Sequence, residues 1–298
     1  MNLTKHTGKI IDKKDGFKIV DCSNCGFIHI FPFPTEKDLK QFYEQEFYQH
    51  ERPNYFIETK EDLPWWMATY NNYYKLFEKY TNGRRLLDIG SGPGHFLLCG
   101  KNRGWETVGI EPSAIAAQYS NNRKLKTIND FFDYDRAKKL GKFDVVHAAL
   151  VLEHIPNPIK FIIDMEKMLK KGGHLAIFCP NDYNPLQKIL CKEKGFQPWW
   201  VVPKHHINYF TTKNMQKLLE KLGLKVEIAL GTFPLEIFPL SGKNYVDNHL
   251  IGRACHKERK MFETLLYKKN PDILNNLYQG LAEVNLGREF LIIAKKIK

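Results

Sequence analysis

LLDIGSGPGHF, residues 86–96, is the most informative stretch of the sequence. An apolar run leads through Asp88 into a turn that contains Gly90, Gly92 and Gly94. Glycines in such a turn permit positive φ and let a ligand lie directly against the backbone. A helix beginning after the turn would point its first N–H groups at that ligand. The stretch therefore predicts a strand, a glycine-rich turn and a helix, with a ligand site at the turn.

Strand-like and helix-like segments alternate on both sides of this turn. FDVVHA, residues 143–148, is apolar without interruption, as in strands buried on both faces of a sheet. Helices are predicted over 158–171, with Asn157 as N-cap and glycines past the end, and over 212–222. This order predicts an α/β fold with a doubly wound, seven-stranded, mostly parallel sheet. The predicted strands cover 85–89, 105–111, 125–128, 143–148, 174–179, 224–230 and 288–296.

The front of the chain differs from the rest. FKIVDCSNCGFIHIF, residues 17–31, alternates apolar and polar residues as a small hairpin would. Residues 35–47 and 64–80 each place aromatic and apolar side chains at helical spacing. The predicted units are an N-terminal extension (1–50), a linker with an aromatic helix (51–83) and the main domain (84–298), which carries an insertion at about 231–286.

Composition limits the classes of protein that fit. The 298 residues are 43% hydrophobic, 26% charged and 13% aromatic, which excludes a disordered chain. No apolar run is long enough to span a membrane, and the first residues lack the apolar core of a secretory signal, so a cytoplasmic protein is expected. The net charge of +12 raises the question of nucleic acid, but the basic runs are short and rich in lysine. A solvated basic surface is favoured, and no nucleic-acid partner is expected.

Cys22 and Cys25 are the only closely spaced cysteines. They form half of a zinc site, because structural zinc takes four ligands. His29 and His6 are candidates for the other two, but neither has a partner at a recognisable spacing. Bound zinc is therefore not expected from the sequence.

Two acidic positions accompany the glycine-rich turn. The pattern is D-x-G-x-G-x-G and departs from the dinucleotide pattern G-x-G-x-x-G, since His95 takes the place of the last glycine. Glu111 ends the second strand, about 20 residues after the turn, where an acid can hold two ribose hydroxyls. Asp130 follows the third strand.

Five motifs occur in the order found in class I S-adenosylmethionine-dependent methyltransferases: LLDIGSGPGHF, VGIEPS, IND, FDVVHAALVLEHIPNP and KKGGHLAIFCPN. The chain resembles that family over about residues 84–230. The closing REFLIIAKK resembles the family's last strand. The resemblance implies a seventh strand antiparallel to the others and S-adenosylmethionine across the ends of the first four strands. It implies that Asp88 supports the amino group of the cofactor, Glu111 holds the ribose and Asp130 meets the adenine. The full set of implied cofactor residues is Asp88, Gly90, Ser91, Gly92, Gly94, Glu111, Pro112, Asp130, Ala148 and Ala149.

Two further resemblances bear on the acceptor. The front segment is similar to bacterial methyltransferases of sugar and cell-surface polysaccharide pathways, which implies O-methylation of a sugar, a polysaccharide precursor or a related small metabolite. LVLEHIPNP resembles the ubiquinone-pathway O-methyltransferases, whose E-x-x-E-H motif can hold a divalent metal; here Leu150 replaces the first acid, and metal dependence is not expected. A quinone-type or other aromatic hydroxyl is thus the alternative acceptor. Two alternative hypotheses come from other classes of protein: a nucleic-acid-modifying enzyme and a noncatalytic cofactor-binding protein. The oligomeric state stays open.

Methyl transfer to a hydroxyl requires a group that removes a proton, and histidine is the best base at neutral pH. His154, with Glu153 beside it, follows the fourth strand, where ligands bind in such sheets. His206, a further catalytic candidate, matches the family segment H-x-x-Y-F-T, and the resemblance implies that this segment anchors the loop beside the active site. A structural role is the alternative for each. The remaining candidates are substrate-facing: Asn181, Asp182, Tyr183, for which a plain turn is the alternative, and His205.

Overall fold

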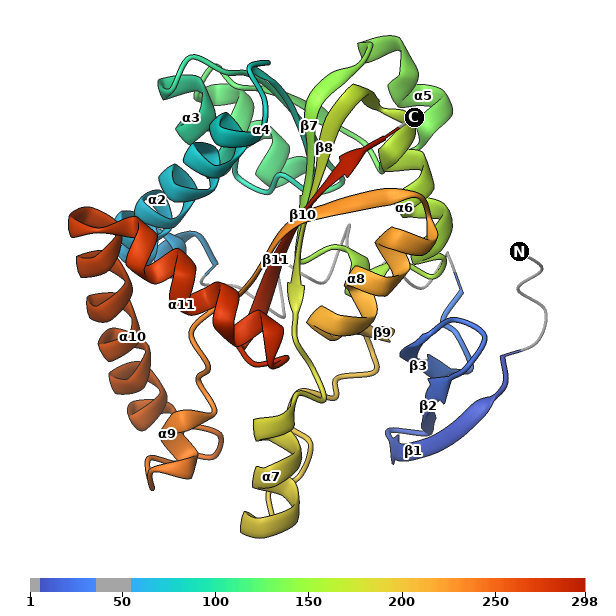
Figure 1. The fold of residues 1–298 in the computed structure, drawn as a ribbon, viewed down its shortest axis with the longest axis vertical. Helices are drawn as coiled ribbons and strands as arrows, with labels where there is room; N and C mark the ends of the chain where they lie inside the picture. Colours follow the sequence, from blue (N-terminus) through green and yellow to red (C-terminus); the bar gives the residue numbers. More distant parts are fainter. Residues whose placement is uncertain (1–5, 36–54, 298) are drawn as a thin grey trace.

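The computed structural model describes residues 6–35 and 55–297, with side chains resuming at Glu61 (Figure 1). Its centre is a seven-stranded sheet of order β10-β11-β8-β7-β4-β5-β6. The pairs among β8, β7, β4, β5 and β6 are parallel, and β11 is antiparallel to both β8 and β10. The predicted fold class is confirmed. The strands are β4 (Arg85–Ile89), β5 (Glu106–Glu111), β6 (Lys126–Asn129), β7 (Phe143–Ala149), β8 (Leu169–Pro180), β10 (Leu224–Gly231) and β11 (Glu289–Lys296).

Helices cover both faces of this sheet. Alternate residues of each inner strand point to opposite faces: Leu87 and Val146 join one apolar core, and Leu86 and Val145 join the other. Figure 1 shows α2, α3 and α11 on one side of the sheet and α6 and α8 on the other. The helices are α2 (Tyr55–Tyr80), α3 (His95–Asn102), α4 (Ala114–Asn122), α5 (Tyr134–Ala137), α6 (Pro158–Lys167), α7 (Pro185–Lys194), α8 (Thr212–Lys221), α9 (Ile237–Leu240), α10 (His249–Lys269) and α11 (Pro271–Glu283), with 3-10 turns η2 (Lys138–Leu140) and η3 (Leu152–His154).

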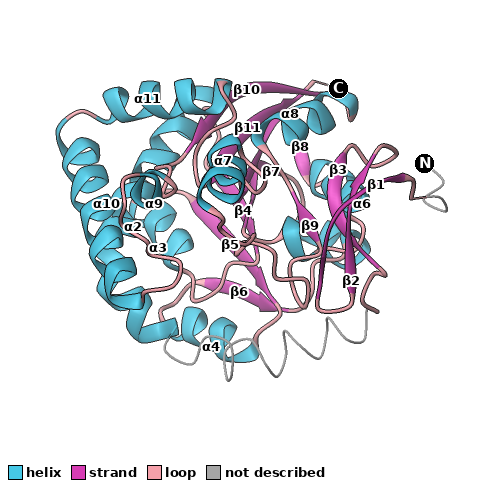
Figure 2. Cartoon of the chain, turned by 90° about the horizontal axis from the view of Figure 1, so that it is seen from below, coloured by secondary structure: helices cyan, strands magenta, loops and turns pink. Residues whose placement is uncertain are grey.

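A second, smaller sheet lies beside the first (Figure 2). Its antiparallel strands, in the order β1-β2-β3-β9, are β1 (Gly8–Lys14), β2 (Phe17–Cys22), β3 (Phe27–Phe31) and β9 (Asn208–Tyr209). The predicted hairpin is β2 and β3. The other two strands were not predicted, because β1 is mostly exposed and β9 has only two residues. Since β9 follows α7 in the chain, this sheet joins the front segment to the main domain.

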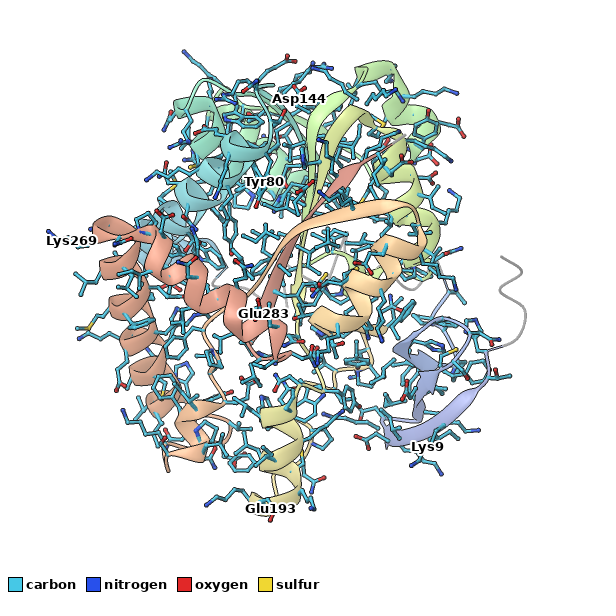
Figure 3. All side chains as sticks on the ribbon, in the orientation of Figure 1. Lys9, Tyr80, Asp144, Glu193, Lys269 and Glu283 are labelled. Atoms are coloured by element: carbon cyan, nitrogen blue, oxygen red, sulfur yellow. The ribbon has the colours of Figure 1, made fainter. Side chains whose placement is uncertain are left out.

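The small sheet and α7 lie toward the carboxyl ends of the parallel strands. Figure 3 shows Asp144, at the start of β7, at the end of the molecule opposite Lys9 of β1 and Glu193 of α7. Ligands of open α/β sheets bind at the carboxyl ends of the strands. The small sheet is therefore placed near the predicted site.

Local signals position most helices as predicted. Asn157 caps α6 by accepting a hydrogen bond from the backbone N–H of Lys160 at 3.1 Å. However, α6 ends at Lys167, so the prediction of a helix to Lys171 was wrong. Leu169 is buried and pairs with Phe143, and β8 therefore begins before the glycines that resembled a helix end.

Of the two helices predicted in the front segment, one begins earlier than expected and the other lies mostly outside the described residues. Helix α2 begins at Tyr55, earlier than the aromatic stripe from Pro64 suggested, because the polar run of residues 58–62 resembled a linker. The helix predicted over 35–47 lies, beyond Thr35, outside the described residues.

The stretch 231–286 contains α9, α10 and α11, and α10 contacts α2 through a 2.7 Å hydrogen bond from the Trp65 indole to Glu263. Among the described helices, none is both long and apolar enough to cross a membrane.

Candidate active site

The glycine-rich turn after β4 has the backbone that the sequence predicted. Gly90, Gly92 and Gly94 all have positive φ, at 73°, 52° and 77°. A Cβ atom at Gly90 would lie 2.6 Å from Cγ2 of Val151, and one at Gly94 would lie 2.3 Å from a serine hydroxyl on α4. The turn is thus held against the segment that follows β7, and the first and last positions have no room for a side chain.

Glu111, at the end of β5, faces this turn. Its carboxylate accepts hydrogen bonds from the backbone N–H groups of Gly92 and Ser113, each at 2.8 Å. Burial raises the pKa of Glu111 to about 7, although both hydrogen bonds act in the opposite direction. A carboxylate can accept about four hydrogen bonds, so two ribose hydroxyls could still bind beside these donors.

Asp88, at the end of β4, has a partner that the sequence analysis missed. Its Oδ1 atom lies 2.7 Å from Nδ1 of His147 on the neighbouring strand β7, and both side chains are buried. The His147 ring also stacks on Phe96, with ring centroids 4.2 Å apart. The only sequence signal was the presence of a histidine inside the apolar run of β7.

The part of the site where the sequence predicts the adenine, around Asn129 and Asp130, is more exposed. Asp130 accepts two hydrogen bonds from the Arg136 guanidinium, at 2.7 and 2.6 Å. The side-chain amide of Asn129 donates to the backbone carbonyls of Glu111 and Pro112, at 3.0 and 2.9 Å. An adenine amine at Asp130 would therefore share that carboxylate with Arg136.

The segment after β7 enters the site with unusual backbone. Ala148 and Ala149 end the strand, and the next residue, Leu150, has a φ of 55° while its N–H donates to the carbonyl of Phe178 at 2.8 Å. A non-glycine residue in this region is strained, and such strain is frequent at functional sites. The side chain of Leu150 is 44% exposed, although it is apolar.

Three candidate catalytic residues meet just beyond this point. Glu153, His154 and His206 place one carboxylate oxygen and two ring nitrogens within 4.8 Å of one another. Nδ1 of His154 donates to the carbonyl of His205 at 2.8 Å, which leaves Nε2 as its proton acceptor, 3.7 Å from Glu153 Oε1. The sequence prediction that these residues share one location is consistent with this geometry.

Burial keeps this cluster uncharged near neutral pH. It raises the pKa of Glu153 to about 8 and lowers that of His154 to about 4. The pKa of His206 is also lowered, by burial first and then by the neighbouring histidines. The cluster therefore offers neutral imidazole, which can accept a proton, beside a protonated carboxyl group.

Comparison with known proteins gives the family. A model described as a methyltransferase domain matches residues 48–228. The chain belongs to this family. The ubiquinone biosynthesis O-methyltransferase of Aliivibrio fischeri is 26% identical over 183 residues, which cover 57% of this chain and 76% of that protein. The protein of the same name from Alkalilimnicola ehrlichii is 32% identical over 113 residues, covering 35% and 44%.

Solved structures share the fold. A SAM-dependent methyltransferase from Archaeoglobus fulgidus matches with a TM-score of 0.50 at 19% identity, covering 81% of this chain and 99% of that one. The plantazolicin methyltransferase BpumL, in complex with SAH, matches with a TM-score of 0.51 at 17% identity, covering 88% and 95%. Together with the family match, these findings confirm a class I methyltransferase whose cofactor is S-adenosylmethionine.

The predicted substrate-facing residues of this methyltransferase are mostly engaged inside the protein. Asn181 is fully buried and donates to the backbone carbonyls of Asn285 and Gly287, at 3.2 and 3.0 Å. Asp182 is buried and pairs with Arg288 at 3.1 Å. These contacts favour the structural alternative, in which the turn after β8 anchors β11.

Tyr183 and His205 belong to the loop side of the site. Tyr183 has a φ of 58°, and its ring packs edge-on against Trp200 at 5.4 Å. It therefore supports the loop that carries His205. The backbone carbonyl of His205 accepts the hydrogen bond from His154, and the His205 ring lies edge-on to the ring of His206, with centroids 5.1 Å apart. Binding of a substrate by either side chain stays a prediction.

Asn208, in β9, is a positioning residue that the sequence analysis missed. Its side-chain amide donates to the carbonyls of Leu152 and Ile155, at 2.9 and 2.7 Å. The neighbouring N–H of Ile207 donates to the carbonyl of Glu153 at 2.8 Å. The small sheet thus holds the backbone of Glu153 and His154 from outside the main sheet. No local pattern could reveal this, because the partners are far apart in the chain.

Proposed function

We propose that this methyltransferase transfers the methyl group of S-adenosylmethionine to a hydroxyl of a small acceptor, with His154 as the base. The observation that carries the proposal is the contact between Gly90 and Val151, which brings the 3-10 turn of His154 against the glycine-rich turn. The N–H of His154 donates to the carbonyl of Val151 at 2.9 Å, so the base is one turn from that contact.

The reaction is an in-line displacement at the methyl carbon. The bond from carbon to the sulfonium sulfur breaks as the bond from carbon to the acceptor oxygen forms, and S-adenosylhomocysteine leaves. The hydroxyl proton passes to Nε2 of His154. The protein contributes alignment of oxygen and methyl, and a neutral base held by the carbonyl of His205.

An aromatic hydroxyl is the acceptor class that we favour. A base whose pKa is lowered to about 4 takes a proton more readily from a phenol, with a pKa near 10, than from a much less acidic sugar hydroxyl. The exposed Leu150 adds an apolar surface at the strand end. The curated relatives described above carry ubiquinone-pathway names, whereas the sugar acceptor expected from the front segment has no support among them.

Two experiments test the proposal in order. Calorimetric titration with S-adenosylmethionine and S-adenosylhomocysteine should give binding that Asp88→Ala and Glu111→Ala weaken. Formation of S-adenosylhomocysteine should then be followed with catechol-type phenols, nucleotide sugars and mixed RNA as acceptors. Turnover of phenols alone supports the proposal, and turnover of sugars alone returns the acceptor to the class implied by the front segment. Salt-sensitive turnover of RNA, or cofactor binding without turnover of any acceptor, would contradict it.

A further inference from the structure

We propose that His6, Cys22, Cys25 and His29 form a structural zinc site that holds the small sheet together. The four residues come from three places in the chain: His6 precedes β1, Cys22 ends β2 and Cys25 lies in the turn before the strand of His29. Pairing of β1 with β2 and of β2 with β3 brings them to one point. Their four potential ligand atoms all lie within 4.8 Å of one another.

The distances between these atoms fit a tetrahedral zinc ion. His6 Nδ1 lies 3.1 Å from His29 Nε2, 3.5 Å from the Cys25 sulfur and 3.9 Å from the Cys22 sulfur. Zinc bonds of about 2.3 Å to sulfur and 2.0–2.1 Å to nitrogen imply tetrahedral edges of about 3.3 Å between nitrogens and about 3.6 Å between nitrogen and sulfur. A single ion can therefore reach all four atoms with little movement of the side chains.

The residues around the four ligands orient one histidine ring and bury the site. Nδ1 of His29 donates to the carbonyl of Ile30 at 2.9 Å, which fixes the tautomer with the lone pair of Nε2 directed at the cluster. His29 and Cys22 are almost completely buried, with 0% and 1% exposure. The ring of Phe33 packs against both histidines, with centroids 5.0 and 4.9 Å away. Such an apolar shell excludes water from the site.

The donor set selects the metal and its role. Two thiolates and two imidazoles in a tetrahedron favour zinc over magnesium or calcium, which prefer oxygen ligands. Four protein ligands leave no open position for a substrate, so the site is structural. The sequence indicated half a site at Cys22 and Cys25, with His6 and His29 as candidates for the rest, and the fold brings the four residues together.

The zinc site is connected to the candidate active site through β3 and β9. His29 lies directly opposite Asn208 in the antiparallel pairing, and the N–H of Ile30 donates to the carbonyl of Ile207 at 2.9 Å. Asn208 in turn holds the carbonyls of Leu152 and Ile155. Zinc would therefore keep the acceptor side of the site in place. This last step rests on the proposed function, whereas the metal site does not.

Metal analysis of the full-length protein is the direct test. The protein should be expressed in zinc-supplemented medium, without an affinity tag that binds metal. Inductively coupled plasma mass spectrometry should then find about one zinc ion per chain. Cys22→Ser and Cys25→Ser should lose most of it. Cys191→Ser is the matched control, because Cys191 is also partly buried but lies outside the cluster, and it should retain the metal.

Cobalt exchange gives a readout that does not depend on activity. The Co²⁺-loaded protein should show the intense visible bands of a tetrahedral site and a thiolate-to-cobalt charge-transfer band, which Cys22→Ser should roughly halve. Near-ultraviolet circular dichroism checks that each variant is folded, and His29→Ala tests the site without touching a thiol. Folded wild-type protein that holds no zinc and gives no tetrahedral cobalt spectrum would overturn the proposal, as would a disulfide between Cys22 and Cys25. Neither result depends on whether any acceptor is methylated.

Discussion

Nδ1 of His147 and Oδ1 of Asp88 lie 2.7 Å apart between two adjacent strands, at the end of the strand that leads into the glycine-rich turn. Asp88 was expected to serve the cofactor alone. The structure gives it a second function, because a buried carboxylate needs a hydrogen-bonding partner and His147 supplies one.

A double-mutant cycle should measure this pair. His147→Ala and Asp88→Asn should each lower the free energy of unfolding, and the coupling between them should be about 1–3 kcal/mol by urea denaturation. His174→Ala is the matched control, since His174 is an equally buried histidine in β8. Coupling of His174 to Asp88 as large as that of His147 would contradict the assignment.

Gly90 should be sensitive to a single methyl group. Gly90→Ala places a Cβ atom 2.6 Å from Cγ2 of Val151 in a left-handed conformation, and cofactor affinity should fall together with stability. The conformation alone costs about 1–2 kcal/mol for alanine. Gly104→Ala, also at positive φ but with open space around it, should show only that cost.

Val151→Ala provides the corresponding rescue. It removes the atom that the new methyl group meets, so Gly90→Ala should be less harmful in the Val151→Ala background by calorimetry and urea denaturation. Equal damage in both backgrounds would show that the contact with Val151 is unimportant.

Cofactor affinity should depend on pH through Glu111. Its pKa is raised to about 7, and ribose hydroxyls bind best to the charged carboxylate. Affinity for S-adenosylhomocysteine should therefore rise about tenfold from pH 6 to pH 8, with proton release at the lower pH. Glu111→Gln should bind more weakly and without this dependence. A wild-type affinity that is flat with pH would remove Glu111 from the ribose site.

Turnover should depend on His154. His154→Ala should lower kcat about 10²–10⁴-fold while cofactor affinity stays nearly the same. Since its pKa is lowered to about 4, the wild-type rate should lose this contribution only below about pH 5. His249→Ala, at an exposed histidine of α10, is the control, and an unchanged rate for His154→Ala would rule out the base.

Glu153 should make the protein less stable as pH rises. Its pKa is about 8 in the folded protein against an ordinary 4.5, so the folded state holds the proton that the unfolded state releases between those values. Stability is therefore lost as pH increases from about 4.5 to about 8, by on the order of 3–5 kcal/mol in all. Glu153→Gln should therefore gain stability relative to wild type from pH 5 to pH 9. Glu220→Gln, at an exposed carboxylate of α8, should show no such trend.

The main sheet could be predicted from the sequence because its signals are local. The run that ends at Asp88, the glycines after it and the N-cap at Asn157 each act within a few residues. The start of β8 was missed because Leu169 is placed by its pairing with Phe143, while the glycines that follow resemble a helix end.

The candidate site could be predicted only in part, for the same physical reason. The motif order was enough to name Glu111 and His154. The partners His147 and Asn208 depend on pairing between strands, and no spacing within one segment reveals them. His6 could be named from the sequence only as a candidate ligand, since it reaches Cys25 only after β1 has paired with β2.

The pairing of β3 with β9 also has a consequence for protein engineering. Removing the front segment would leave β9 without its partner strand β3. Ile207 and Tyr209 would then lose the apolar cluster that they share with Ile19 and Ile30. The same holds for chimeras that exchange the front segment with that of a relative. The hairpin and the loop that ends in β9 are one transplantable unit, and they should be moved together or left together.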